Sequence, residues 1–95
     1  MTGISGKVGE EILYRILVPA GSTNLKFEMS GGTGDFDLSI RPNTPPTLST
    51  WTCRPYVAGN NETCTVANPA SGTWYAMLYV YEDGAGVSLK ATVTP

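Results

Sequence analysis

Glycine and proline interrupt this chain about every ten residues, and short runs of alternating apolar and polar side chains lie between them. The 95 residues include 11 glycines and 7 prolines. This spacing of turn residues is typical of all-β sandwiches and barrels. We find no apolar repeat with the 3.6-residue period of a helix. The sequence therefore predicts an all-β fold, a two-sheet antiparallel β-sandwich of about seven or eight strands.

The composition limits what such a sandwich could do. The apolar fraction is 41% and the charged fraction 15%, which predicts one globular domain over residues 1–95. The net charge is −2, and the six basic residues are scattered, so we expect no nucleic-acid partner. No apolar run is long enough to predict a membrane span. The absence of histidine removes the commonest acid/base residue and zinc ligand, so we expect no enzyme activity.

The N-terminal half predicts three strands from alternation alone. Residues 12–18 place Tyr14 and its even-numbered neighbours inward, and residues 2–9 read as a short edge strand and turn. Residues 24–30 and 35–41 each have one apolar and one polar face, and the glycines of SGGTG lie between them. We expect these two strands to pair as a hairpin. Residues 42–49, PNTPPTLS, have no period and are expected to be a loop.

Two cysteines flank a second, smaller unit that we expect from residues 51–56 and 62–66. Cys53 and Cys64 are eleven positions apart and are the only cysteines. No CxxC spacing or histidine offers them a metal or redox role, which favours a disulfide. Such a bridge is worth about 3 kcal/mol in the chain-entropy model and indicates an oxidising compartment. The alternative is a pair of buried free thiols in a cytosolic protein.

Residues 72–86, GTWYAMLYVYEDGAG, contain the strand on which the functional prediction depends. Successive side chains of a strand point to opposite faces, so Trp74 and its even-numbered neighbours predict a core face. The opposite face then carries Tyr75, Met77, Tyr79 and Tyr81. An exposed aromatic stripe of this kind usually marks a docking surface. The alternative is that Tyr75 and Met77 are covered by the N-terminal segment or by residues 42–49.

Two carboxylates offer a second candidate site. Asp35 and Asp37 lie on one face of the same predicted strand, which suggests part of a calcium site. Calcium takes six to eight oxygen ligands, so two carboxylates alone do not complete one. The alternative is that Asp35 accepts backbone N–H bonds in its own turn and Asp37 faces solvent near Arg41. Arg54 could stack with a ligand, or it could pair with Glu62.

Three consecutive motifs resemble a known family. SGGTGDFDLSIRP at residues 30–42, TCRPYVAGNNETC at 52–64 and NPASGTWYAMLYVYEDGAGVSLKATV at 68–93 together resemble the bacterial pre-peptidase C-terminal domain. The resemblance implies a jelly-roll-like sandwich at the C-terminal end of a secreted peptidase, outside the cell, often removed after export. Many members carry a charged residue or glycine where Tyr79 and Val80 stand. The related collagen-binding domains of collagenases look more aromatic on this strand.

These observations lead to one functional hypothesis and two alternatives. We expect a monomeric, non-catalytic accessory domain, cut from a larger secreted enzyme, that holds a polymeric extracellular substrate through the tyrosine face. Protein such as collagen is the expected substrate, and polysaccharide is the less favoured one. The first alternative is therefore a carbohydrate-binding module of a secreted hydrolase. The second is an export or solubility appendage without a ligand.

Overall fold

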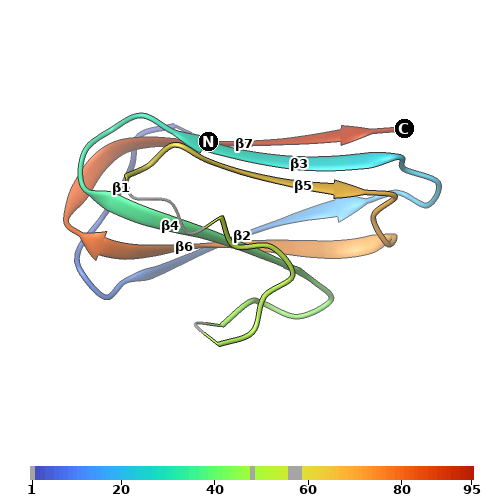
Figure 1. The fold of residues 1–95 in the computed structure, drawn as a ribbon, viewed down its shortest axis with the longest axis horizontal. Coiled ribbons are helices and arrows are strands. Elements are labelled where there is room, and N and C mark those ends of the chain that lie inside the picture. The colour runs from blue at the N-terminus through green and yellow to red at the C-terminus, as the bar shows by residue number, and fades with distance from the viewer. Residues whose placement is uncertain (1, 48, 56–58) are drawn as a thin grey trace.

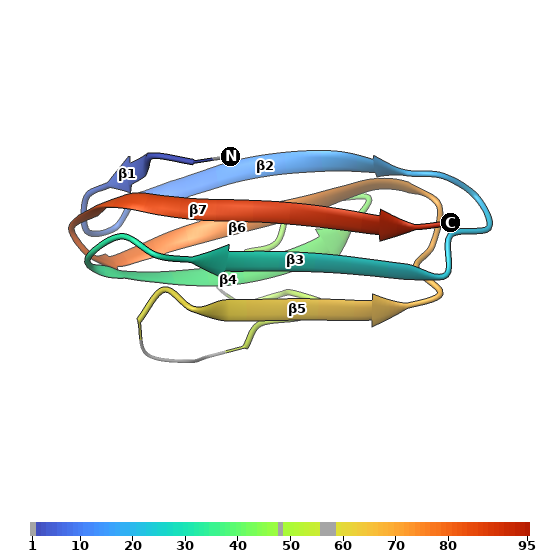
Figure 2. The same cartoon turned by 90° about the horizontal axis from the view of Figure 1, so that it is seen from above.

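The chain folds into two antiparallel β-sheets that pack face to face (Figures 1 and 2). The computed structural model describes residues 2–47, 49–55 and 59–95. The strands are β1 (Ile4–Gly6), β2 (Glu11–Val18), β3 (Asn24–Ser30), β4 (Asp35–Pro42), β5 (Glu62–Ala67), β6 (Gly72–Glu82) and β7 (Gly84–Thr94). One sheet has the order β1-β7-β3-β5 and the other β2-β6-β4. The predicted all-β sandwich is confirmed. Among the described residues there is no apolar helix long enough to cross a bilayer.

The core lies between the sheets and is built from alternate side chains of both. The expected inward faces of β3, β4 and β6 are confirmed, since their apolar side chains are buried. Some residues of the opposite face are buried as well, namely Asp37, Ser39 and Met77. The largest fully buried side chains are Phe27, Phe36, Leu25, Met29, Leu38, Ile40 and Leu78. Full burial of one such side chain stabilises a fold by about 1.5–3 kcal/mol. Trp74 also lies in this core and donates its indole N–H to the carbonyl oxygen of Ala70 at 2.9 Å.

The expected hairpin between β3 and β4 is wrong. β3 pairs with β5 and β7 in one sheet, whereas β4 pairs with β6 in the other. The intervening residues 31–34 cross from one sheet to the other, as the left-hand end of Figure 1 shows. Alternation reports which face of a strand is buried and does not report which strand it bonds to. Two strands that face each other across a core therefore have the same pattern as two strands of a hairpin.

The first segment of the expected disulfide unit lies against β4. Residues 51–56 do not form a strand beside β5 in their described part. Instead Cys53 makes an isolated bridge with Ile40 on β4. The backbone N–H of Ile40 donates to the carbonyl oxygen of Cys53 at 2.9 Å. Tyr56 lies outside the described residues. The segment that carries Cys53 is therefore bound to the edge of the three-stranded sheet.

The predicted disulfide between Cys53 and Cys64 is formed. Its Cα atoms are 6.0 Å apart, within the normal range for a bridge. Cys64 lies on β5, so the bridge ties the loop on the β4 edge to the opposite sheet. The covalent link therefore holds the two layers together at one margin of the sandwich.

Replacing both Cys53 and Cys64 by alanine is expected to lower the free energy of unfolding by about 3 kcal/mol. The unfolded chain gains the conformations that the bridge forbids, and the core loses only the buried sulfur of Cys64. Urea unfolding of the oxidised protein and the double variant measures this difference. A loss below about 0.5 kcal/mol would contradict the stabilising role given to the bridge.

Candidate ligand-binding surface

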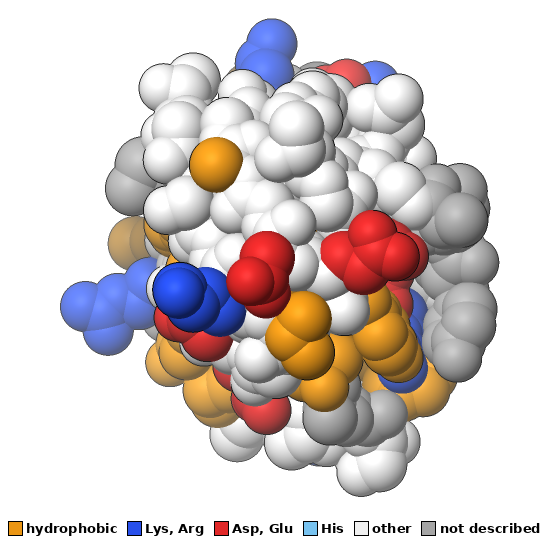
Figure 3. Space-filling model, turned by 90° about the vertical axis from the view of Figure 1, so that its left-hand side faces the viewer, with side chains coloured by type: hydrophobic (Ala, Val, Ile, Leu, Met, Phe, Trp, Pro, Cys, Tyr) orange, Lys and Arg blue, Asp and Glu red, His pale blue; other side chains and the backbone are white. Residues whose placement is uncertain are grey.

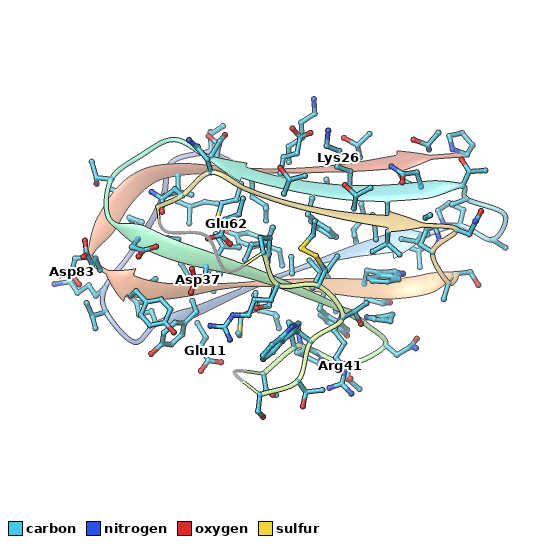
Figure 4. The ribbon with its side chains drawn as sticks, in the orientation of Figure 1. Glu11, Lys26, Asp37, Arg41, Glu62 and Asp83 are labelled. Atoms are coloured by element: carbon cyan, nitrogen blue, oxygen red, sulfur yellow. A yellow bond between two sulfur atoms is a disulfide. The ribbon has the colours of Figure 1, made fainter. Side chains whose placement is uncertain are left out.

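The outer face of the β2-β6-β4 sheet carries the expected aromatic strand at its centre. The strand register places Tyr79 between Glu11 of β2 and Asp37 of β4. Further along the sheet, Met77 lies between Leu13 and Ser39, and Tyr75 between Arg15 and Arg41. Figure 4 shows Glu11 and Arg41 projecting from this face, below the ribbon. The outer face is therefore a mixed surface on which aromatic side chains have charged neighbours.

The exposed part of the β6 stripe is shorter than the sequence predicts. Met77 is only 2% exposed, so the expectation that it belongs to an exposed stripe is wrong. Tyr75 and Tyr79 are half-buried, and Tyr81 is 45% exposed. The rings of Tyr79 and Tyr81 meet edge to face, with their centroids 4.9 Å apart. The buried Met77 divides Tyr75 from this pair. The accessible aromatic surface of β6 is concentrated where the strand approaches β7.

A loop residue extends this pair of tyrosines. Trp51, 39% exposed, lies on the segment that follows β4, which runs below the three-stranded sheet in Figure 1. The Arg54 guanidinium carbon lies 4.9 Å from the centroid of the Trp51 ring, and Arg54 Nη2 donates to Tyr81 Oη at 3.4 Å. Arg54 thus joins the loop tryptophan to the strand tyrosine. We call Trp51, Tyr79 and Tyr81 the aromatic patch.

Arg54 is fixed in place by a buried carboxylate. Arg54 Nη2 lies 3.6 Å from Asp37 Oδ2, and both side chains are buried. The expectations that Arg54 pairs with Glu62 and that Asp37 faces solvent near Arg41 are therefore wrong. A buried Arg54 is also not free to stack with a ligand. It is a positioning residue, since it contacts a ring of the patch on one side and Asp37 on the other.

Asp37 has a second buried carboxyl group, that of Glu62, beside it (Figure 4). Glu62 Oε1 accepts the backbone N–H of Leu38 at 2.8 Å. Burial raises the pKa of Glu62 from its ordinary 4.5 to about 8, against the Leu38 bond that lowers it. Burial also raises the pKa of Asp37, against the influence of the neighbouring Glu62 carboxyl group and the charge of Arg54, which lower it. The folded chain thus favours the protonated form of Glu62, whose Oε2 is buried without a hydrogen-bond partner among the described residues.

The carboxylates proposed as part of a calcium site contact protein groups instead. Asp35 Oδ1 accepts the backbone N–H of Gly59 at 3.2 Å, so its partner is not in its own turn. Asp37 is paired with Arg54. Within the described ranges, no group of three or more Asp, Glu, His or Cys side chains is arranged to hold a metal ion. The two aspartates therefore bind neighbouring protein segments to β4.

Exposed hydrophobic side chains occur at one end of the molecule, although the most exposed one, Leu17, lies near the opposite end of β2. Figure 3 shows them over the lower half of this end, the half formed by the three-stranded sheet, below two groups of acidic side chains. Tyr81 and Trp51 are among the few large hydrophobic residues that are strongly exposed. Clustered exposed aromatic rings are a typical feature of a surface that binds a partner. Strand parity could find the tyrosines, but it had no means of finding Trp51 on an aperiodic loop.

Comparison with known proteins gives concordant results. The family model described as "Bacterial pre-peptidase C-terminal domain" matches residues 10–79. Alkaline serine exoprotease A of Vibrio alginolyticus is 44% identical over 96% of this chain and 17% of that protein. Extracellular protease of Xanthomonas campestris pv. campestris is 49% identical over 97% of this chain and 16% of that protein. The chain thus spans about a sixth of the length of these relatives.

A solved structure supports the same fold. The structure titled "Solution structure of vEP C-ter 100" is 38% identical, with a TM-score of 0.79. The match covers 95% of this chain and 88% of that chain. The likeness therefore extends over the whole sandwich and is not confined to one hairpin.

Proposed function

The chain belongs to the bacterial pre-peptidase C-terminal domain family, and on that basis we propose that it holds polymeric protein substrate for a secreted peptidase. It is an accessory domain and not the catalytic part, since its relatives are several times longer proteases. Those relatives are secreted, which agrees with the disulfide and with the predicted extracellular location. Such a domain can bind substrate without catalysing a reaction itself.

The aromatic patch is the observation that supports this function best. Its rings are held in place before any ligand arrives, because Arg54 contacts both Trp51 and Tyr81 and is itself paired with Asp37. A pre-ordered surface loses less conformational entropy when it binds. Flat, amphipathic rings suit a polypeptide that offers apolar side chains and backbone carbonyls together. A collagen-like helix or a denatured strand has this chemistry.

The area of the patch predicts a weak single site. If the rings each lose about 100 Å² of apolar surface, the gross gain is about 7 kcal/mol at about 25 cal/mol per Å². Association costs at least about 4 kcal/mol, which leaves a dissociation constant in the millimolar range. An insoluble polymer repeats the same site many times, and a tethered enzyme stays close to it. Weak binding is therefore sufficient for a domain that keeps a peptidase on its substrate.

We expect the chain to sediment with insoluble collagen, and the Trp51→Ala and Tyr81→Ala variants to bind at least about tenfold more weakly, since each loses one ring of the patch. Tyr75→Ala is the matched control. It removes a half-buried ring from the same face but outside the patch. Sedimentation with each polymer, followed by assay of the supernatant, measures this.

Chitin and cellulose test the carbohydrate alternative in the same experiment. Retention on these polymers and not on collagen would make the chain a carbohydrate-binding module. A chain that stays in the supernatant with every polymer would contradict substrate binding altogether and leave the export appendage. Equal losses for Tyr75→Ala and Tyr81→Ala would place the contact elsewhere on the face.

A further inference from the structure

The two edges of the β2-β6-β4 sheet differ in whether their outward backbone groups have partners. On β4, the outward-pointing backbone N–H groups are occupied. Phe36 donates to Asn60 Oδ1 and Leu38 to Glu62 Oε1, each at 2.8 Å, and Ile40 donates to the carbonyl oxygen of Cys53. Among the described strands, β2 pairs with β6 alone. In the described part of the chain the outer edge of β2 has no partner strand, and Figure 2 shows β2 along the upper margin of the sandwich.

β2 lacks several of the features that usually protect an edge strand, although it carries two exposed charged side chains, Glu11 and Arg15. It pairs with β6 in continuous register over Glu11–Val18 and contains neither a proline nor a bulge. Two of its outward side chains are large and exposed, Leu13 at 48% and Leu17 at 72%. The other outer strands differ, since β1 has only three residues. β5 presents Thr63, Thr65 and Ala67 as its exposed side chains. β2 is the edge best suited to receive another strand.

The charges on β2 indicate what that strand is. We propose that β2 pairs antiparallel with β2 of a second copy of this chain, around a two-fold axis at Leu13. In this register Glu11 lies opposite the partner's Arg15, and Arg15 lies opposite the partner's Glu11. The two copies of Leu13 then face each other. Centring the axis on Tyr14 would place Leu13 against a charged Arg15, and centring it on Arg15 would oppose two guanidinium groups.

The size of this contact sets its strength. Pairing along one short strand buries less surface than the roughly 1,200–2,000 Å² of a stable interface. The resulting dimer is therefore weak, and the domain is a monomer, as the sequence predicts, when dilute. Pairing joins the three-stranded sheets of two copies into one continuous sheet. Two copies brought close together on a polymer would reach the concentration at which this occurs.

Charge reversal on β2 tests the proposal. Sedimentation equilibrium of the wild-type chain is expected to show the mean mass rising above 10.1 kDa as the concentration increases. Glu11→Arg and Arg15→Glu each create two like-charge pairs in the proposed register. Each variant alone is expected to dimerise at least about tenfold more weakly. An equimolar mixture of the two variants restores opposite charges at every pair, so its mean mass should rise again.

The matched control is Lys26→Glu, which changes the net charge as Arg15→Glu does but lies on β3 in the other sheet. It should dimerise like the wild type. Circular dichroism confirms that each variant is folded. A wild-type chain that stays at 10.1 kDa up to about 1 mM overturns the proposal, as does a dimer indifferent to both reversals. A peptide in which arginine, leucine and glutamate alternate with threonine tests the other possible occupant of the edge. If the chain binds this peptide but does not self-associate, β2 pairs with a strand of another protein and the dimer proposal is wrong.

Discussion

Raising the pH from about 5 to about 9 is expected to lower the free energy of unfolding by on the order of 3 kcal/mol. Burial raises the pKa of Glu62 to about 8 in the folded chain, against an ordinary 4.5. The folded state therefore holds a proton that the unfolded state releases above pH 4.5. The resulting stability is fully present below pH 4.5 and is lost as the pH rises through about 8. The raised pKa of Asp37 acts in the same direction.

Glu62→Gln is the matched variant for this prediction. Glutamine keeps the oxygen that accepts the Leu38 N–H and replaces the protonated oxygen by an amide that can donate to Asp37. The variant should therefore have a much flatter stability profile between about pH 5 and about pH 9. Urea unfolding at a series of pH values measures both proteins. A wild-type profile that is flat in this range, or a variant as steep as the wild type, would contradict the assignment to Glu62.

Gly32→Ala is expected to lower the free energy of unfolding by about 3 kcal/mol. Gly32 has a φ of 71°, which disfavours any side chain. A Cβ atom there would also collide with the carbonyl oxygen of Ala85 and approach the backbone nitrogen of Val87 to 2.7 Å. These are backbone atoms at the start of β7, so they cannot move aside as a flexible side chain can. The β3–β4 crossing would have to separate from the start of β7.

Gly21→Ala separates the cost of the positive φ from the cost of the steric collision. Gly21 has a φ of 82°, but a Cβ atom there would meet nothing within 4 Å. We expect it to cost about 1 kcal/mol, the penalty of the left-handed conformation alone. Denaturant unfolding of both variants measures the difference between them. Equal losses for the two would show that the β3–β4 crossing does not pack tightly against the start of β7.

Side-chain alternation was sufficient to predict most of the core. Phe36, Leu38 and Ile40 are inward on β4 as expected, as are the even-numbered residues from Trp74 to Val80 on β6. These assignments succeed because burial on one face of a strand is a local property of period two. The partner of each strand is not local. Residues 31–34 could have closed a hairpin, and the crossing depends on contacts distant in sequence, such as the packing of Gly32 against the start of β7.

The site was predicted less completely for a related reason. Parity placed Tyr79 and Tyr81 on the outer face, but it carried no information on what covers that face. Met77 is buried there, in the row between Leu13 and Ser39. Trp51 and Arg54 reach the patch from a loop whose path follows from the Cys53 bridge to β4. Neither the pairing of Arg54 with Asp37 nor the burial of Asp37 has a signal in sequence spacing.

We propose that Trp51, Tyr79 and Tyr81 receive the substrate. Amide and indole chemical shifts of the labelled chain, followed during titration with a soluble triple-helical collagen peptide, test it most directly. We predict that the shifts change first at the Trp51 indole and at Tyr79 and Tyr81, with little change on β3 and β5 of the opposite sheet. Unchanged shifts at saturating peptide, or changes confined to the opposite sheet, would contradict the claim.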